Sequence, residues 1–285
     1  MSKVLVTGGS GFIGSNLCRL LHESGHSVLS LDLKESSPKP WGVVVADIRE
    51  FQVPNDIEII IHLAAQISVA HSVTEPEETF SINVEGTKNI VKGAVSAGVR
   101  RFIFASSAAV YGDAEMMPIT ESAPLLPQSP YAESKIQGEV ILNNSELMTC
   151  SMRFFNVYGH GQSATGGYAA VIPAFKKAIS LDDKPNIFGD GSQVRDFVHV
   201  SDLVRIIEIA INCEELPTEV NIASGEKTSL LGLLSALKVH YPSMRDPIFE
   251  AERAGDIHTS VADISKMVQY FNPGKMIGLS EGLQY

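Results

Sequence analysis

The sequence predicts an α/β protein built on a doubly wound parallel sheet. Through the first half of its 285 residues, short apolar runs alternate with segments in which apolar residues recur at helical spacing. Such alternation is typical of parallel strands joined by helices that cover both faces of the sheet. A glycine-rich turn follows the first apolar run, and the next run ends in an acidic residue. Together these observations predict a ligand site beyond the carboxyl ends of the strands.

The N-terminal stretch supplies the first strand, turn and helix. Val4–Val6 is a buried-strand run, and Gly8, Gly11 and Gly14 follow at three-residue spacing. The helix after them is marked, up to a stop at Gly25, by Phe12, Ile13, Leu17, Leu20 and Leu21. Glycine lets the backbone approach a pyrophosphate, and a helix N-terminus favours its negative charge. A glycine triplet alone also fits an ordinary strand-to-helix turn.

The second strand makes this motif more specific. Val28–Leu31 has the composition of a strand, and Asp32 ends it. This acid lies about 20 residues past the glycines, where a carboxylate holds the ribose hydroxyls of a dinucleotide. Because an acid repels the extra phosphate of NADP, the sequence predicts NAD as the cofactor.

The next elements continue the alternation. Strands are expected at Val43–Ala46, Ile57–Ile61, Phe102–Ala105 and Ser151–Phe155, and helices over Pro76–Ala97 and from Tyr131 to about Glu146. Ser129 as N-cap and Pro130 at the first helical position make a good start for the second helix.

The pattern changes after Gly159. A glycine-rich loop over Gly159–Gly167 precedes an expected helix at Tyr168–Ser180. Further on, strands are expected at Glu219–Ile222 and Pro247–Phe249, and helices at Leu203–Ile211 and Leu230–Val239. We predict a Rossmann-type NAD-binding domain over residues 1–159 and a smaller, interleaved substrate lobe over 160–285. Residues 186–212 are expected to pack back on the first domain.

Composition excludes several classes of function. The apolar share of 44% and charged share of 19% are those of a globular protein. A net charge of −11 argues against nucleic-acid binding. Cys18, Cys150 and Cys213 share no metal or redox spacing, which predicts free thiols in a reducing compartment and no metal site. With a strand at the very start and no membrane-length apolar run, we expect a cytoplasmic protein without signal peptide or membrane span.

Tyr131 and Lys135 form the candidate catalytic pair. Their i, i+4 spacing places both side chains on one face of the expected helix. A nearby ammonium and a positive cofactor would lower the phenol pKa from about 10 towards the range of a general base. Ser107, at the end of the strand Phe102–Ala105, could share a substrate proton with Tyr131. Chance placement on an amphipathic helix is the alternative for the pair, and turn chemistry is the alternative for the serine.

An ordered set of motifs runs nearly from end to end of the chain. It comprises Thr7–Gly14, Asp32, Asp47-Ile48, His62–Ala65, Asn83, Ser106–Gly112, Tyr131–Lys135, Arg153–Gly159, Gly189–Asp196, Asn221–Gly225 and Arg253–Asp256. With this set the chain resembles the extended short-chain dehydrogenases/reductases, specifically the nucleotide-sugar epimerase branch typified by UDP-galactose 4-epimerase.

The resemblance implies roles for particular residues. For the cofactor it implies Gly8, Gly11, Phe12, Ile13, Gly14, Asp32, Asp47, Ile48, Leu63, Ala64, Ala65, Asn83, Tyr131 and Lys135. For catalysis it implies Ser107, Tyr131 and Lys135. For the nucleotide-sugar substrate it implies Ser107, Asn156, Arg195, Arg253 and Asp256. His62, His199 and Asp196 also match the family but are better interpreted as structural hydrogen-bonding groups.

The resemblance also implies finer properties. The position that gates the C2 substituent of the sugar falls at Ser260, whose small size would admit an N-acetyl group. The helices at Pro76–Ala97 and Tyr131–Glu146 would form a homodimer interface. Apolar residues compatible with it, and equally with core packing, are Ile90, Val91, Val95, Ile136 and Val140.

The implied reaction is NAD-dependent C4 epimerisation of a UDP-hexose, such as UDP-glucose or UDP-galactose, through a transient 4-keto sugar. Related dehydratases and decarboxylases place an acid where this chain has Ala108 or Ala109, and alanine transfers no proton. Epimerisation is therefore preferred over these reactions. A dehydrogenase or reductase of the same family stays open, because it needs only serine, tyrosine and lysine. A non-catalytic NAD sensor is disfavoured by the presence of both Tyr131 and Lys135.

Overall fold

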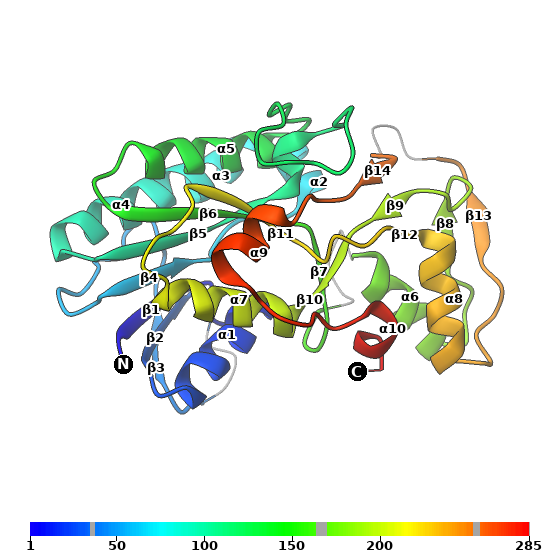
Figure 1. The fold of residues 1–285 in the computed structure, drawn as a ribbon, viewed down its shortest axis with the longest axis horizontal. Coiled ribbons are helices and arrows are strands. Elements are labelled where there is room, and N and C mark those ends of the chain that lie inside the picture. Colours follow the sequence, from blue (N-terminus) through cyan, green and yellow to red (C-terminus); the bar gives the residue numbers. More distant parts are fainter. Residues whose placement is uncertain (35–37, 164–169, 253–256, 285) are drawn as a thin grey trace.

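The computed structural model describes residues 1–34, 38–163, 170–252 and 257–284. In this part of the chain, seven parallel strands form one sheet in the order β11-β6-β5-β4-β1-β2-β3 (Figure 1). The strands are β1 (Lys3–Thr7), β2 (Ser27–Asp32), β3 (Gly42–Val45), β4 (Ile59–His62), β5 (Arg101–Ser107), β6 (Met148–Phe154) and β11 (Glu219–Ile222). The doubly wound α/β fold is confirmed.

Strand order reverses between β1 and β4. The chain proceeds from β1 to β2 and β3 in one direction, and from β4 to β5, β6 and β11 in the other. A crevice opens beyond the carboxyl ends of the strands at such a reversal, so this is where ligands bind in open α/β sheets.

The two faces of the sheet have separate apolar cores, because neighbouring strand residues point to opposite faces. Val4, Val6 and Ile61 pack with the helices α1 (Phe12–Glu23), α7 (Val200–Asn212) and α9 (Ser265–Phe271). Leu5 and Ile60 pack on the other face, which is covered by α3 (Pro76–Phe80), α4 (Gly86–Ala97) and α5 (Pro130–Asn143). In Figure 1 the α3–α5 layer lies above the sheet and α1 and α7 lie below it.

The expected helix Pro76–Ala97 differs in detail. A π-helical segment, η1 (Ser81–Glu85), separates α3 from α4, and a further helix, α2 (Val69–Thr74), precedes them. The wider π turn contains Asn83. Such turns have a longer hydrogen-bond spacing than an α-helix, which periodicity of apolar residues does not reveal.

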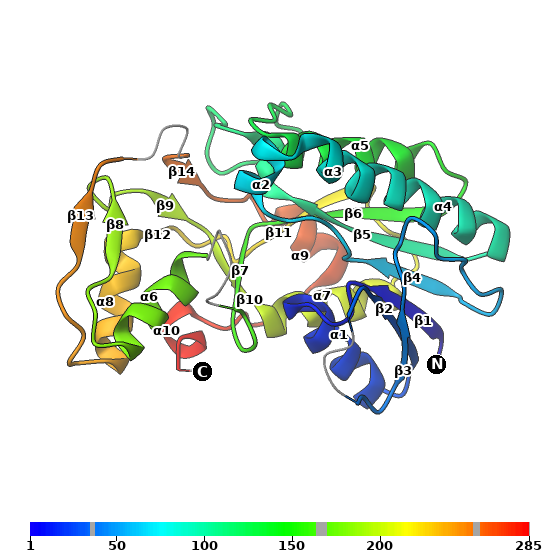
Figure 2. The ribbon, with the colours of Figure 1, turned by 180° about the vertical axis from the view of Figure 1, so that it is seen from behind.

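A smaller lobe lies beyond the carboxyl ends of the strands (Figures 1 and 2). Its helices are α6 (Val171–Ser180), α8 (Leu230–His240) and α10 (Leu279–Gly282). Its strand groups are β7 (Asn156–Tyr158) with β10 (Phe197–His199), β8 (Asn186–Phe188) with β13 (Ile248–Glu250), and β9 (Val194–Arg195) with β12 (Thr228–Ser229) and β14 (Thr259–Ser260). The lobe has its own core, which includes Phe175, Ile187 and Leu233.

Two segments depart from the expected bounds of this lobe. Strand β11 pairs with β6 in the central sheet, although it follows residue 160 in the chain. Of residues 186–212, α7 packs against α1, whereas β8 and β9 pair with strands of the smaller lobe. The lobe that a strand joins cannot be predicted from its local sequence, because a strand can be apolar in either lobe.

Other features of the described chain bear on the sequence expectations. Cys18 and Cys150 are buried, Cys213 is half-buried, and all three are free. Among the described residues no helix has the length and apolarity needed to cross a membrane. The described part of the expected loop and helix at 159–180 contains Gly159–Ser163 and α6, while residues 164–169 lie outside the described ranges.

Candidate active site

A cavity of about 640 Å³ lies where the strand order reverses. Its wall is formed by residues that follow the carboxyl ends of β1, β2, β4 and β5, together with part of α5. Sequence-predicted residues on this wall are Gly8, Gly11, Phe12, Ile13, Gly14, Asp32, Asp47, Ile48, Leu63, Ala64, Ala65, Ser107, Tyr131 and Lys135. The structure therefore gathers most of the predicted cofactor and catalytic residues around one cavity.

The glycine turn after β1 has no room for a side chain at Gly8 or at Gly14. Gly8 adopts φ +71°, and a Cβ there would lie 2.8 Å from the backbone nitrogen of Ala64. A Cβ on Gly14 would lie 2.1 Å from the carbonyl oxygen of Gly8. Helix α1 begins at Phe12 with Gly11 as N-cap and no side-chain cap. Its first backbone N–H groups are thus left for an anion at the cavity wall.

Asp32 stands at the end of β2 beside this turn. Its Oδ2 accepts a hydrogen bond from the Ser10 N–H at 2.9 Å, and its Oδ1 accepts one from the Leu33 N–H at 2.8 Å. These bonds fix the carboxylate on the cavity wall while leaving it further acceptor capacity for hydroxyl groups. The arrangement suits a ribose diol and disfavours a phosphate.

Asp47 has a partner that sequence reasoning did not identify. Arg49 donates from Nε to Oδ1 and Oδ2 at 3.0 Å each, and its Nη1 donates to Ser81 Oγ at 3.1 Å. The hydrogen bond from this guanidinium, opposed by a small burial effect, holds the pKa of Asp47 below its usual range. The acid therefore stays ionised at the cavity edge next to Ile48.

Helix α5 carries Tyr131 and Lys135 into the cavity. The helix starts as predicted, with Pro130 in its first turn and the Ser129 hydroxyl accepting from the Ala132 N–H at 3.2 Å. The buried Lys135 donates from Nζ to the Ala105 carbonyl oxygen at 2.8 Å. Burial lowers the pKa of Lys135 to about 8, with the Glu139 charge acting in the opposite direction.

The Tyr131 phenol differs from the sequence expectation. Burial raises its pKa above the ordinary value, and the hydrogen bond with Ser107 only partly opposes this. The expected lowering by Lys135 is absent because the ammonium binds the Ala105 carbonyl and lies 5.8 Å from the Tyr131 ring centroid. In the protein alone the phenol is thus neutral, and ionisation requires a further positive charge in the cavity.

Asn83 is the exception among the predicted cofactor residues in the described chain, because it does not line the cavity. It is buried in the π segment, where its Nδ2 donates to the Gln66 carbonyl and to Ser134 Oγ at 2.9 Å each. Its Oδ1 accepts from the Gln66 N–H at 2.7 Å. Asn83 therefore fixes the loop after β4 rather than facing a ligand.

Sequence reasoning missed several wall residues of this cavity. They are Leu33, Ala46, Gln66, Ile67, Ile82, Ala105, Ser106, Phe154, Phe155, Val157 and Gln162. Of these, Leu33, Ser106 and Val157 lie one or two residues past a predicted strand, so reading past each strand end would have found these three.

A second cavity, of about 380 Å³, adjoins the first on the side of the smaller lobe. The two share Val157 and Gln162 as wall residues. Asn156 and Arg195, both predicted for substrate, line this second cavity rather than the first. Asn156 donates to the Asp196 carbonyl at 3.1 Å, and Arg195 donates to the Val194 carbonyl at 3.0 Å. The other predicted substrate residues, Arg253 and Asp256, lie outside the described residues.

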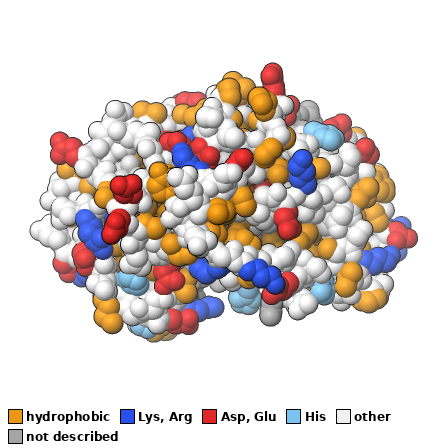
Figure 3. Space-filling view, viewed as in Figure 1, with side chains coloured by type: hydrophobic (Ala, Val, Ile, Leu, Met, Phe, Trp, Pro, Cys, Tyr) orange, Lys and Arg blue, Asp and Glu red, His pale blue; other side chains and the backbone are white. Residues whose placement is uncertain are grey.

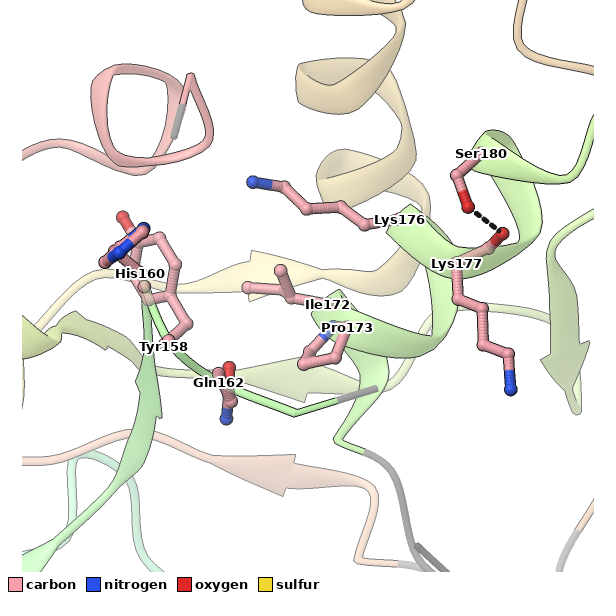
Figure 4. Close-up of a pocket in the computed structure, with 10 residues that line it drawn as sticks. Tyr158, His160, Gln162, Ile172, Pro173, Lys176, Lys177 and Ser180 are labelled. Atoms are coloured by element: carbon pink, nitrogen blue, oxygen red, sulfur yellow. Dashed lines mark hydrogen bonds between the residues drawn. The ribbon is translucent and has the colours of Figure 1, made fainter. Parts of the chain in front are cut away.

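A third cavity, of about 350 Å³, lies beside the second. Figure 4 shows Lys176 reaching from α6 towards Tyr158 and His160, while Lys177 points away. On the face of the molecule in Figure 3, Lys and Arg side chains are interspersed with acidic ones instead of forming one patch.

The remaining polar candidates have structural partners. His62 contacts the hydroxyls of Thr7 at 2.7 Å and Thr87 at 3.0 Å, and burial lowers its pKa to about 3. Asp196 accepts from the Ser224 and Gly225 N–H groups at 2.8 and 2.9 Å. None of these lines the first cavity, and in the described ranges no group of three or more His, Cys, Asp or Glu gathers as metal ligands.

Comparison with known proteins agrees with this geometry. Residues 4–223 match the model of the NAD dependent epimerase/dehydratase family. A UDP-glucose 4-epimerase of Mycolicibacterium smegmatis is 35% identical over 301 residues, spanning 99% of this chain and 96% of the relative. The UDP-glucose 4-epimerase of Thermotoga maritima, solved with UDP-glucose, superposes with a TM-score of 0.91 at 30% identity, covering 99% of this chain and 96% of that one. A UDP-N-acetylglucosamine 4-epimerase of Methanobrevibacter ruminantium, solved with UDP-N-acetylmuramic acid, gives 0.92 at 30% identity, with 99% and 96% covered.

Proposed function

This chain belongs to the NAD-dependent epimerase/dehydratase family, and from that premise we propose that it epimerises C4 of a UDP-hexose such as UDP-glucose or UDP-galactose. The observation that carries the proposal is the meeting of Ser107, Tyr131 and Lys135 on one cavity wall beside the glycine turn. An isomerase of this kind uses NAD without net consumption.

The first cavity fits NAD. The uncapped start of α1 and the glycine turn suit the pyrophosphate, Asp32 suits the adenosine ribose, and Asp47 with Ile48 would border the adenine. When bound, NAD supplies a hydride acceptor and the positive charge that the buried phenol lacks. Lys135 would hold the nicotinamide ribose.

Proton transfer falls to the chain's own residues. Tyr131, once ionised, removes the proton of the sugar 4-hydroxyl, and Ser107 donates a hydrogen bond to the same oxygen. Lys135 does not lower the phenol pKa in the protein alone, so its ammonium would act together with the positive charge that bound NAD supplies. Because the sugar is oxidised to a 4-keto form and then reduced on its other face, Tyr131 must return the proton it took.

The second cavity would hold the nucleotide diphosphate while the sugar turns. Arg195 offers a planar, permanently charged donor set, which suits phosphate oxygens. Asn156 lies on the same wall, and the family pattern adds Arg253 and Asp256. Anchoring at the diphosphate would leave the hexose free to present either face at the first cavity.

Epimerisation is preferred over elimination because of the turn that follows Ser107. The residues there are Ala108 and Ala109 in the short helix η2 (Ala108–Tyr111). Without a carboxyl group, neither of these two positions can remove or donate the proton that loss of water requires.

A direct assay tests the proposal. Purified protein is mixed with UDP-glucose or UDP-galactose without added NAD, and the sugar products are measured. We expect interconversion of the two sugars and release of NAD on denaturation. A requirement for stoichiometric NAD or NADH would instead support a dehydrogenase or reductase.

Ser260 bears on the choice of sugar. In β14 it is the register partner of Arg195, which lines the second cavity. Its small side chain would leave space for an N-acetyl group at C2. Ser260→Tyr should therefore reduce activity on UDP-N-acetylglucosamine more than on UDP-glucose, measured by competition kinetics. Equal loss on both sugars would contradict this role.

Burial leaves fewer of the expected apolar residues available for a homodimer interface. Ile90 and Val91 are buried in the core, whereas Val95 and Val140 are 44% and 51% exposed on α4 and α5. We propose that the exposed pair contributes to self-association through these helices. Val140→Glu should shift the protein from dimer to monomer in sedimentation, and an unchanged mass would count against the interface.

A further inference from the structure

A buried ion pair lies directly beneath the candidate active site. Glu139 on α5 and Arg153 on β6 are 5% and 4% exposed. Arg153 donates from Nη2 to Glu139 Oε2 at 2.7 Å and from Nε to Oε1 at 3.0 Å. The proposed reaction uses neither residue. Since burying two charges is costly, a pair with this two-bond geometry calls for an explanation.

The ion pair continues into a buried hydrogen-bond network. Arg153 Nη1 donates to the Tyr111 hydroxyl at 2.9 Å, and this hydroxyl donates to Asn221 Oδ1 at 2.6 Å. Asn221 Nδ2 donates to the Ile119 carbonyl at 2.9 Å. The Nε, Nη1 and Nη2 atoms of Arg153 therefore all donate hydrogen bonds within the network, and these bonds fix Arg153 and Glu139 in place.

Two successive residues of β5 are bound to two successive turns of α5. Lys135 donates to the carbonyl oxygen of Ala105, and Ser106 Oγ donates to Glu139 Oε1 at 2.5 Å. The next residue along β5 is Ser107. Lys135 and Glu139 lie one turn apart on the same face of α5, so both can bind the end of β5 at once. These two bonds fix the strand backbone that carries Ser107.

The titratable and charged groups around Lys135 come from the three elements α5, β4 and β6. From α5 it faces Tyr131 and Glu139, from β4 it faces the neutral His62, and Arg153 of β6 lies behind Glu139. Burial lowers the pKa of Lys135, and Glu139 opposes that effect. Because Glu139 also neutralises Arg153, Lys135 is the remaining cation of this group.

We propose that Glu139 is a positioning residue of the active site, which fixes the end of β5 against α5 and supplies a negative charge one helical turn from the Lys135 ammonium. This inference rests on the proposed function, in which Lys135 and Ser107 act together with Tyr131. It predicts two separable effects, one on the charge of Lys135 and one on the placement of Ser107.

The charge effect is tested by a cycle of variants. Glu139→Gln keeps an acceptor for Ser106 but leaves Arg153 unbalanced, so the pKa of Lys135 should fall by about one unit. Arg153→Met leaves Glu139 unbalanced, so the pKa should rise. The double variant should return it towards the wild-type value. Lys135 is titrated by NMR in protein with ¹³C-labelled lysine, with its signal assigned from Lys135→Met.

This titration needs no sugar substrate, so its result does not depend on the proposed reaction. The two single variants are expected to shift in opposite directions, and either one that folds gives a result. Asp202→Asn is the matched control, because Asp202 is another buried acid paired with an arginine, Arg205, on the opposite face of the sheet. It should leave the Lys135 titration unchanged. A Lys135 pKa that stays constant across the cycle would overturn the charge effect.

The positioning effect is tested with Ser106→Ala. This change keeps both charges and removes the bond between β5 and Glu139, so kcat should fall about tenfold with little change in KM or in the Lys135 titration. If kcat instead matches that of the wild-type protein, the strand end does not depend on Glu139 and the positioning role is wrong.

Discussion

The two sides of the candidate active site are built differently. On the cofactor side, the wall residues follow β1, β2, β4 and β5, which are joined in one sheet. On the substrate side, Asn156 stands on β7 and Arg195 on β9, which belong to separate small sheets. The hydrogen-bond register of a sheet fixes the first group in advance, whereas packing between lobes positions the second. Changes on the cofactor side should therefore act on NAD binding and on the placement of the catalytic groups, and those on the substrate side on the affinity for the UDP-sugar.

The largest effect is expected where the two sides meet. Tyr131→Phe removes the hydroxyl that carries the proton and should lower kcat about 10³-fold, the scale of general base catalysis. NAD content and thermal stability should be unchanged. Turnover of UDP-galactose measures the effect, with Tyr270→Phe, which is packed against the far core, as control. Retained activity would show that another group moves the proton.

Next in size is a change to the cofactor side alone. Gly14→Ala places a methyl group 2.1 Å from the Gly8 carbonyl oxygen and should force the turn to shift. Overpacking of this kind costs about 1–3 kcal/mol, so NAD affinity should fall by up to about 100-fold. Calorimetric titration of NAD into stripped protein measures it. Gly278→Ala, where a Cβ meets nothing within 4 Å, is the control; if both variants bind NAD equally, the turn does not set cofactor affinity.

A smaller effect is expected on the substrate side. Arg195→Met should raise KM for the UDP-sugar about tenfold, because hydrogen bonds to charged groups contribute about 1.5–3 kcal/mol. NAD affinity and kcat should stay near their wild-type values. Arg245→Met, which removes an exposed arginine of the same lobe that donates to the Asp182 carbonyl, is the control. A fall in kcat without a change in KM would contradict the division between the two sides.

The smallest effect is a loss of protein stability at low pH, caused by His62 at the end of β4 on the cofactor side. His62 has a folded pKa of about 3, below its unfolded value of about 6.5, because burial disfavours its charged form. The unfolded chain therefore binds the proton first, and the stability that His62 contributes above pH 6.5 is lost as pH falls. Between pH 7 and about 5.5 this amounts to about 1 kcal/mol.

Urea unfolding at the two pH values measures this loss. His62→Asn should lose about 1 kcal/mol less than the wild-type protein over the same interval. Equal losses in the wild-type protein and His62→Asn would mean that other groups govern the acid response.

Sequence patterns were sufficient for the cofactor side. Each strand there is a short apolar run, and the residues that matter follow it within a few positions, as Gly8 follows β1 and Ser107 ends β5. Local spacing therefore predicted the strands, the glycine turn and Asp32, whereas Asp47, Ile48 and Leu63–Ala65 came from the family resemblance.

The missed features depend on backbone geometry, side-chain conformation, burial and strand pairing rather than on the spacing of residue types. The inward direction of Asn83 follows from a π turn, and the pairing of Asp47 with Arg49 depends on side-chain conformations that no spacing specifies. The raised pKa of Tyr131 results from burial, which outweighs the hydrogen bond with Ser107. Strand β11 joins the central sheet from beyond the predicted boundary because it pairs with β6, about 70 residues earlier in the chain, and no local pattern specifies such a partner.

The turn at Ala108 and Ala109 has a consequence for how this fold changes during evolution. These alanines belong to a short helix whose start is capped by Ser107, whereas Tyr131, Lys135 and Glu139 share one long helix. An acid could be introduced on the turn without disturbing that helix or the glycine turn. Divergence between isomerase and lyase chemistry would then need few substitutions, with proton transfer and cofactor binding inherited unchanged.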